Sequence, residues 1–378
     1  MKKKPHNKKI RNKEIFTVID LFSGIGGFSD GFAQARFKRQ LIYDVRLLVD
    51  KDIEAAYTFK RNNPSVPFWV TDIEQIESKS LLEHARIEDV DIVIGGPPCQ
   101  GFSSAGKRLF DDPRNSLLGV FVRVIGELRP KAILLENVPN VFNGSHGQYG
   151  EELLQNLDKA GYVSAAKVLH SEDFGVPQKR RRVFVFALRK DLGIRSLEFP
   201  KPSMVSVTVE QAIGDLPSLE AGQGHDPMQY AMCPQSDYQR KRRYKSVLLF
   251  NHLAPNHSKD LVKKISIIPE GGANRHLPPQ ERFSNNYYSQ AYARLHRDEV
   301  AYTITGSFLN PGSGRFIHYR DVRALTIREA ARLQSFDDNF VFHGTMTAQE
   351  RHVGNAVPPI LAKVLAEYLA RILKSTGC

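Results

Sequence analysis

A cysteine and a glutamate stand where apolar runs end, and this pairing is typical of covalent catalysis with acid–base assistance. Cys99 lies in GGPPCQGFS (95–103), directly after the apolar run VDIVI (90–94). Its proline, glycine and glutamine neighbours form loops, so we expect an accessible thiol, whose thiolate is the reactive form. Glu136 ends the apolar run in KAILLENV (131–138), where a carboxylate is costly unless it is paired or used. Together the two side chains predict a nucleophile with a partner acid.

Two arginines supply the cations that such a site needs. Arg180 and Arg182 are alternate residues of QKRRRVF (178–184), at the start of another apolar run. Alternate residues of a strand point to the same side, so both guanidinium groups could hold a carboxylate or a carbonyl oxygen. A solvent-exposed strand edge is the alternative for this pair.

A glycine-rich turn and two aspartates predict a cofactor that contains adenosine. DLFSGIGGF (20–28) follows the first apolar run, and such a turn lets backbone N–H groups and a helix N-terminus approach a ligand. Ser29 stands where a dinucleotide fingerprint has its third glycine, which disfavours a nicotinamide oxidoreductase. Asp50 and Asp72 follow later predicted strands and would suit a ribose hydroxyl and an adenine amino group, although each alone could be an ordinary loop acid.

The elements that position these residues alternate between strand and helix from residue 15 to about residue 190. This alternation predicts an α/β fold with a doubly wound sheet, in which ligands bind at the carboxyl ends of the strands. From about 195 to 290 the content of proline, glycine and serine rises, and the segment predicts a second, less regular domain. The predicted strands are IFTVID (15–20), VRLLVD (45–50), DIVIGG (91–96), KAILLENV (131–138) and RRVFVFAL (181–188), and an amphipathic helix is predicted over 358–373.

Charge and cysteine content narrow the class of protein. The 378 residues carry a formal charge of +12, with 53 lysines and arginines against 41 aspartates and glutamates, which favours a polyanionic partner. Three cysteines lie far apart, so we predict no disulfide framework and no metal site, in agreement with a reducing cytoplasm. No run of about 18 apolar residues occurs, so we expect no transmembrane helix and no membrane partner.

Six segments in order make the chain resemble the DNA cytosine-5 methyltransferase family, in particular the bacterial methylases of restriction–modification systems. The resemblance implies a doubly wound, Rossmann-like domain dependent on S-adenosylmethionine, with an inserted, irregular and smaller target-recognition domain. The segments are DLFSGIGGF, GGPPCQGFS, ENV (136–138), VPQKRRRVF, RALTIREAARLQSF (323–336) and GNAVPP (354–359). The implied division is a basic disordered tail (1–14), a catalytic and cofactor domain (15–194), a target-recognition domain (195–300) and a return segment (301–378) whose C-terminal helix packs on the catalytic domain.

The resemblance also implies a role for each site residue. Cys99 would add to C6 of a flipped cytosine, and Glu136 would contact N3 and the exocyclic amine. Arg182 would contact O2, and Arg180 would orient the carboxylate. C5 would then take a methyl group from S-adenosylmethionine, held by Phe22, Gly24, Gly26, Asp50, Asp72, Pro97, Leu117 and Asn355.

Two departures from the family pattern affect the cofactor site. Asp50 stands where the family commonly has glutamate, which shortens the reach to the ribose by one methylene. Lys51 stands where an aromatic or hydrophobic residue often covers the adenine.

The substrate implied by the resemblance is double-stranded DNA, methylated by a monomer in the bacterial cytoplasm. A cognate restriction endonuclease would act on the same site without forming a stable complex.

A structured RNA such as tRNA is one alternative substrate, but the Cys-Phe-Thr signature of the RNA-acting branch is absent from the sequence. A catalytically idle DNA-binding protein is another, and it would lack Cys99 or Glu136, which are both present. The predicted DNA contacts are Gln100, Ser103, Arg240, Lys241, Arg242 and Arg243.

Overall fold

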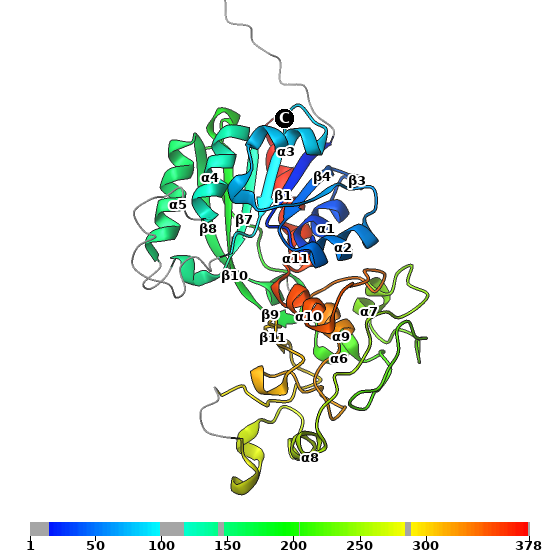
Figure 1. Cartoon of the computed structure of the whole chain (residues 1–378). Helices are drawn as coiled ribbons and strands as arrows, with labels where there is room; N and C mark the ends of the chain where they lie inside the picture. The colour runs from blue at the N-terminus through cyan, green and yellow to red at the C-terminus, as the bar shows by residue number, and fades with distance from the viewer. Residues whose placement is uncertain (1–14, 99–116, 143–146, 204, 284–288, 377–378) are drawn as a thin grey trace, which may run out of the picture.

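A computed structural model describes residues 15–98, 117–142, 147–203, 205–283 and 289–376 (Figure 1). Its centre is a seven-stranded sheet with the order β5-β4-β1-β6-β7-β10-β8. The five strands from β5 to β7 are parallel, and β10 runs antiparallel to both β7 and β8. The strands are β1 (Phe16–Leu21), β4 (Tyr43–Asp50), β5 (Phe68–Val70), β6 (Ile92–Gly95), β7 (Ala132–Asn137), β8 (Tyr162–His170) and β10 (Arg181–Arg189).

Helices cover both faces of this sheet, as the continuous apolar runs of its strands require. Successive residues of β1 belong to opposite clusters: Val18 packs in the core beneath α1 and α11, whereas Ile19 packs in the core beneath α3, α4 and α5. The predicted doubly wound α/β fold is therefore confirmed. The helices around the sheet are α1 (Gly27–Gln34), α2 (Ile53–Asn62), α3 (Ser78–Ala85), α4 (Leu117–Leu128), α5 (Gly147–Lys159) and α11 (Pro359–Ser375).

The C-terminal helix α11 lies against α1, although 324 residues lie between the nearest ends of the two helices, Gln34 and Pro359. Leu361, Leu365 and Leu369 of α11 recur every fourth residue and are buried against the sheet. A Cβ added at Gly31 of α1 would lie 2.4 Å from the Cβ of Ala362, so the close approach of the two helices requires this glycine. The chain thus returns to the first domain at its end.

The lower part of the molecule in Figure 1 holds a second, smaller domain with short elements. Most of its apolar core comes from residues between Val207 and Val353, including helix α9, and Ile25 and Ala55 of the large domain pack into the same core. Residues on both sides of position 300 share this core, and the predicted domain boundary at 300 stays a prediction. The elements are α6 (Val209–Ile213), α7 (Asp237–Arg242), α8 (Lys259–Ile267), α9 (Ile327–Leu333), α10 (Met346–Asn355), and the paired strands β9 (Gln178–Lys179) and β11 (Ala301–Tyr302).

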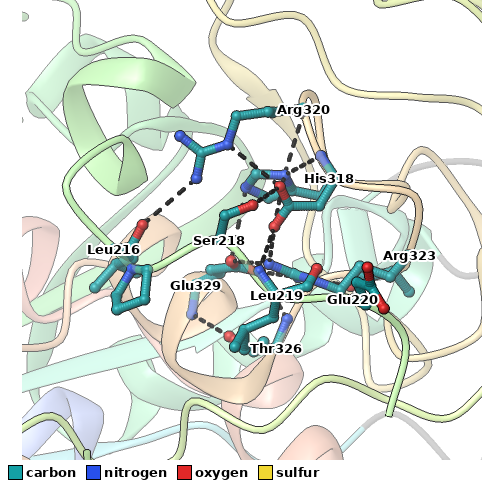
Figure 2. Close-up of polar contacts among 12 residues, drawn as sticks. Leu216, Ser218, Leu219, Glu220, His318, Arg320, Arg323, Thr326 and Glu329 are labelled. Carbon is teal, nitrogen blue, oxygen red and sulfur yellow. Dashed lines mark hydrogen bonds and ion pairs between the residues drawn. The ribbon is translucent and has the colours of Figure 1, made fainter. Parts of the chain in front are cut away.

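A buried network of charges stabilises the smaller domain around the start of α9 (Figure 2). The fully buried guanidinium of Arg323 forms ion pairs with Glu329 at 2.8 Å and Asp321 at 2.6 Å. Burial alone would raise the pKa of Glu329, but the charges of Arg323 and His318 outweigh it and lower that pKa below its usual range. Ser218 donates to Asp321 at 2.6 Å. The network therefore joins the segment before α7 to the segment that leads into α9. Because each buried charge has a partner of opposite charge, the free-energy cost of removing these charges from water is offset.

Within the part of the chain that the structure describes, no helix combines the length and the apolar character needed to cross a bilayer.

Candidate active site

A cavity of 410 Å³ lies at the carboxyl ends of strands β1, β4, β6 and β7. Such an edge is where doubly wound sheets bind their ligands. Six predicted cofactor residues and three predicted catalytic residues line this one cavity: Phe22, Gly24, Asp50, Asp72, Leu117, Asn355, Glu136, Arg180 and Arg182. The structure therefore brings together groups that are separated by up to 333 positions in the chain.

The turn after β1 has the left-handed backbone that its glycines predict. Gly24 has φ +51° and Gly26 has φ +79°. Gly24 borders the cavity, whereas Gly26 is not among the described residues that line it, and its contact with a cofactor stays a prediction. A Cβ at Gly26 would lie 2.7 Å from the ring of Phe59, so this glycine is needed for packing and for the start of α1.

The Asp50 carboxylate is held in place by two backbone amides. The N–H of Gly24 donates to Oδ2 at 2.8 Å, and the N–H of Asp52 donates to Oδ1 at 2.9 Å. Asp72 is less constrained, since its Oδ1 accepts from the N–H of Glu74 at 3.2 Å. Each carboxylate oxygen has a second lone pair, so both aspartates keep acceptor capacity toward the cavity.

Asp20 also lines the cavity, and the sequence analysis missed it. Its carboxyl is buried at the end of β1, where Oδ2 accepts from the Ser29 hydroxyl at 2.6 Å. Oδ1 is buried and has no hydrogen-bond partner among the described residues. Burial raises the pKa of Asp20 to about 7. The signal that could have revealed it is the one used for Glu136, an acid at the end of a buried apolar strand.

Glu136 and Arg182 form an ion pair beside this cofactor region. Nε of Arg182 lies 3.0 Å from Oε1 of Glu136, and both side chains are mostly buried. The pairing follows from the sheet, because Phe184 of β10 stands directly opposite Glu136 of β7 and Arg182 is two residues from Phe184 on the same face. Burial raises the pKa of Glu136, and the charges of Arg182 and Arg180 only partly oppose this shift.

Arg180 makes different contacts from those predicted. Its side chain is buried, and Nη1 donates to the backbone carbonyls of Ile304 at 3.1 Å and Gly354 at 2.9 Å. The guanidinium that binds the Glu136 carboxylate is that of Arg182, whereas Arg180 joins the large domain to the return segment. The spacing of Arg180 and Arg182 predicted that both side chains point to the same side of the strand. It could not show which groups each guanidinium binds.

The loop after β6 enters the cavity next to Glu136. A Cβ at Gly96 would lie 3.5 Å from Oε2 of Glu136, and Pro98 lines the cavity. Pro97, predicted to contact the cofactor, is instead buried, and its carbonyl accepts from Nδ2 of Asn137 at 3.0 Å. This corrects the prediction for Pro97. Cys99, Gln100 and Ser103 lie outside the described residues.

The predicted DNA contacts on α7 divide into two kinds. Arg240 and Lys241 are exposed, although Arg240 also pairs with Asp237. Arg242 is buried and forms an ion pair with Asp337 at 2.9 Å. Arg243 forms an ion pair with Asp215 at 3.0 Å. It also lies 3.7 Å from the centre of the Tyr230 ring.

These contacts argue against two of the four predicted DNA contacts, Arg242 at the end of α7 and Arg243 directly after it. Arg242 and Arg243 bind the protein's own acids and ring, so they are not available to grip phosphates. Arg240 and Lys241 stay predictions.

The strand order, in which the antiparallel strand β10 lies between β7 and β8, agrees with a Rossmann-like methyltransferase fold. The model of C-5 cytosine-specific DNA methylases matches residues 16–371. The chain therefore belongs to the C-5 cytosine-specific DNA methylase family, and it is a DNA cytosine-5 methyltransferase. The predicted family, fold and enzyme class are confirmed.

Relatives named as type II methyltransferases match nearly the whole chain. M1.HphI of Haemophilus parahaemolyticus is 40% identical over 362 residues, covering 94% of this chain and 87% of that protein. M.DdeI of Desulfomicrobium norvegicum is 35% identical and covers 93% of this chain and 88% of its own.

Solved structures share the fold. A putative DNA modification methyltransferase encoded within an E. coli prophage matches with a TM-score of 0.78 and 26% identity, over 95% of this chain and 99% of that chain. Spodoptera frugiperda DNMT2 matches with a TM-score of 0.62 and 18% identity, over 95% of this chain and 99% of its own.

Proposed function

We propose that this enzyme methylates cytosine within a specific sequence of double-stranded DNA by transient addition of the Cys99 thiolate to C6 of a flipped base. The observation that carries the proposal is the shared cavity, which is lined by the Glu136–Arg182 pair, by Gly24 in the turn after β1 and by Asp50 at the end of β4. Pro98, the residue before Cys99 in the sequence, lines the same cavity.

The chemistry of the cavity fits S-adenosylmethionine. Asp50 and Asp72 offer carboxylate oxygens for hydroxyl and amino groups, and the buried Oδ1 of Asp20 lacks a protein partner. Phe22, Leu117 and Asn355 would complete the binding surface. When bound there, S-adenosylmethionine supplies an electrophilic methyl group.

The chain's own residues would do the rest of the chemistry. A base inside a duplex is out of reach, so it must be extruded at a cost of a few kcal/mol. The Cys99 thiolate would form a bond to C6, which breaks the ring's aromaticity and makes C5 nucleophilic. The raised pKa of Glu136 favours a carboxyl that can donate a proton to N3 as negative charge develops on the ring. After C5 has gained the methyl group, loss of its proton and elimination of the thiol would release the product.

Arg182 would act on the same ring while it holds Glu136 in place. Its Nε is occupied by the carboxylate at 3.0 Å, and Nη1 donates to the carbonyl of Arg181 at 2.8 Å. The remaining N–H groups of the guanidinium would be able to reach O2 of the base. Arg180 would contribute by fixing the β9–β10 segment to Gly354 and Ile304.

We further propose that the enzyme protects host DNA against a restriction endonuclease that cleaves the same site. Its relatives are named type II methyltransferases, which supports this role. The enzyme would act as a monomer in the bacterial cytoplasm, where its DNA substrate lies, and would not form a stable complex with the endonuclease.

The test is methylation of fragmented genomic DNA by the purified enzyme, followed by mapping of 5-methylcytosine. We expect 5-methylcytosine within one short sequence context. A pool of structured RNA treated in parallel should stay unmodified. Methylation of the RNA but not of the DNA would overturn the proposed substrate in favour of the RNA alternative.

A further inference from the structure

A cluster of three side chains joins the two walls of the cavity near Asp50. Asp52, the residue that caps helix α2, accepts a hydrogen bond at Oδ2 from Nη2 of Arg351 at 2.6 Å. Nε2 of His352 lies 3.0 Å from the same oxygen. Arg351 and His352 belong to α10, whose Val353 is part of the core of the smaller domain. The cluster therefore links the large domain to the smaller one, and all three residues line the cavity.

The two oxygens of Asp52 have separate tasks. Oδ1 accepts from the N–H groups of Glu54 at 3.0 Å and Ala55 at 3.2 Å and so caps α2. Oδ2 accepts hydrogen bonds from Arg351 and His352. Burial would raise the pKa of Asp52, but the hydrogen bonds from His352 and Arg351 outweigh it and lower the pKa to about 2. The carboxylate is therefore ionised, and Nε2 of His352 must carry the proton that it donates.

Both ends of the cluster lead directly to predicted cofactor residues. On the large domain, the N–H of Asp52 donates to Oδ1 of Asp50 at 2.9 Å. On the smaller domain, Asn355 lies on α10 one helical turn after Arg351 and His352, and it lines the cavity. A shift of α10 away from Asp52 would therefore separate Asp50 from Asn355.

We propose that Asp52, Arg351 and His352 form a clasp that positions Asp50 and Asn355 and thereby sets the affinity for S-adenosylmethionine. This inference rests on the proposed function and adds positioning residues to it. The clasp lies at the rim of the cavity, since 47% of the Arg351 side chain and 25% of the Asp52 side chain are exposed. The His352 side chain is only 4% exposed and connects this rim to the interior of the protein. The clasp holds the Asp50 side and the Asn355 side of the cavity in place before the cofactor binds, which lowers the entropic cost of binding. Loss of the clasp should therefore reduce the affinity for the cofactor and leave the rate of the chemical step unchanged.

The experiment measures the dissociation constant of S-adenosylhomocysteine by titration calorimetry on the full-length enzyme. Asp52→Asn keeps a side-chain oxygen for the helix cap and removes the charge that binds Arg351. We expect about tenfold weaker binding for Asp52→Asn and for Arg351→Ala, as is typical when a hydrogen bond between charged groups is lost. His352→Gln retains an N–H donor and should bind more tightly than His352→Ala.

The matched control is Asp191→Asn, which removes the carboxylate from another aspartate–arginine pair. Asp191 pairs with Arg189 at 2.7 Å and is not among the described residues that line the cavity. This variant should bind S-adenosylhomocysteine like the wild type.

The outcomes separate the clasp from the proposed function. In the clasp variants, KM for S-adenosylmethionine should rise as the affinity falls, and kcat should stay within about twofold of the wild type. The clasp is overturned if Asp52→Asn and Arg351→Ala bind as tightly as Asp191→Asn, or if they lose kcat with unchanged affinity. Failure of the wild type itself to bind S-adenosylhomocysteine would instead contradict the proposed function.

Discussion

Arg180 donates from its buried guanidinium to the backbone carbonyl of Gly354, which lies 174 positions further along the chain. A Cβ at Gly354 would lie 2.3 Å from the backbone of Thr305, so the chain at this point accommodates only a glycine. The bond joins the segment that leads into the catalytic strand β10 to the end of α10. Two segments that resemble family motifs, VPQKRRRVF and GNAVPP, thus meet in space.

We predict that Arg180→Met will destabilise the fold as well as reduce methyl transfer. The substitution leaves two buried carbonyls, those of Ile304 and Gly354, without this donor, at a cost of about 3 kcal/mol in the free energy of unfolding. Urea denaturation measures this change. Arg181→Met, at the exposed neighbouring residue, is the control and should change stability by less than about 0.5 kcal/mol. Equal stability of the two variants would contradict a joining role for Arg180.

Replacing Cys99 with alanine should abolish methyl transfer and leave binding of S-adenosylhomocysteine nearly intact, because the thiol is needed for the bond to C6 and not for the cofactor. DNA that carries 5-fluorocytosine should form a denaturation-resistant adduct with the wild type, since the blocked C5 cannot lose a proton. Gel electrophoresis under denaturing conditions detects the adduct. Turnover by Cys99→Ala, or an active wild type that forms no adduct, would refute covalent attack.

Glu136→Gln removes the proton donor while keeping a side chain of the same shape next to Arg182. We expect methyl transfer to fall by at least about a hundredfold, the usual contribution of a general acid. The measurement is the single-turnover rate at saturating DNA and cofactor. Binding of S-adenosylhomocysteine should be unchanged, and a rate within a few-fold of the wild type would show that Glu136 does not act on the base.

The stability of the cofactor-free enzyme should fall as pH rises from about 4 to about 7 because of Asp20. Its pKa is raised by burial from 3.8 to about 7 in the folded state. Between these values the folded protein retains a proton that the unfolded chain has released, so each step up in pH favours unfolding. Denaturation curves across this range should show a weaker decline in Asp20→Asn than in the wild type. If the stability of both proteins declined equally with pH, this would argue against a protonated Asp20 in the folded protein.

Affinity for DNA should decrease steeply with salt, as expected for a protein of net charge +12 that binds phosphates. If the exposed Lys241 contacts a phosphate, Lys241→Ala should reduce the slope of log affinity against log salt by about one. Arg243→Ala is the comparison, and it should leave the slope unchanged because Arg243 is paired with Asp215. Fluorescence anisotropy with duplex DNA measures both slopes. An unchanged slope for Lys241→Ala would remove it from the DNA contacts.

Local sequence was sufficient to predict most of the sheet. The run VRLLVD lies within β4, KAILLENV contains β7, and RRVFVFAL lies within β10. These strands are buried on both faces, so apolar residues follow one another without interruption and mark each strand clearly. The domain boundary at 300 stays a prediction, because the smaller domain has short, irregular elements and its core is assembled from segments on both sides of that position.

The sequence indicates the location of a site candidate most clearly where a strand end determines the location of its side chain. Asp50 and Glu136 end strands and line the cavity. Pro97 and Gly26 were harder to place, because adjacent loop residues point in different directions and only the folded backbone determines which of them faces the cavity. Arg242 and Arg243 failed because a run of positive charge does not reveal the acids that fold against it, here Asp337 and Asp215.

The sequence by itself determined the family, the doubly wound sheet and the chemical types of the site residues, because buried strands and strand-end turns are encoded by neighbouring residues. The tertiary structure decided the partners: Arg182 rather than Arg180 on Glu136, and α10 against Asp52. These contacts join residues that are distant in the chain, and their geometry depends on how two domains pack, which no local pattern specifies.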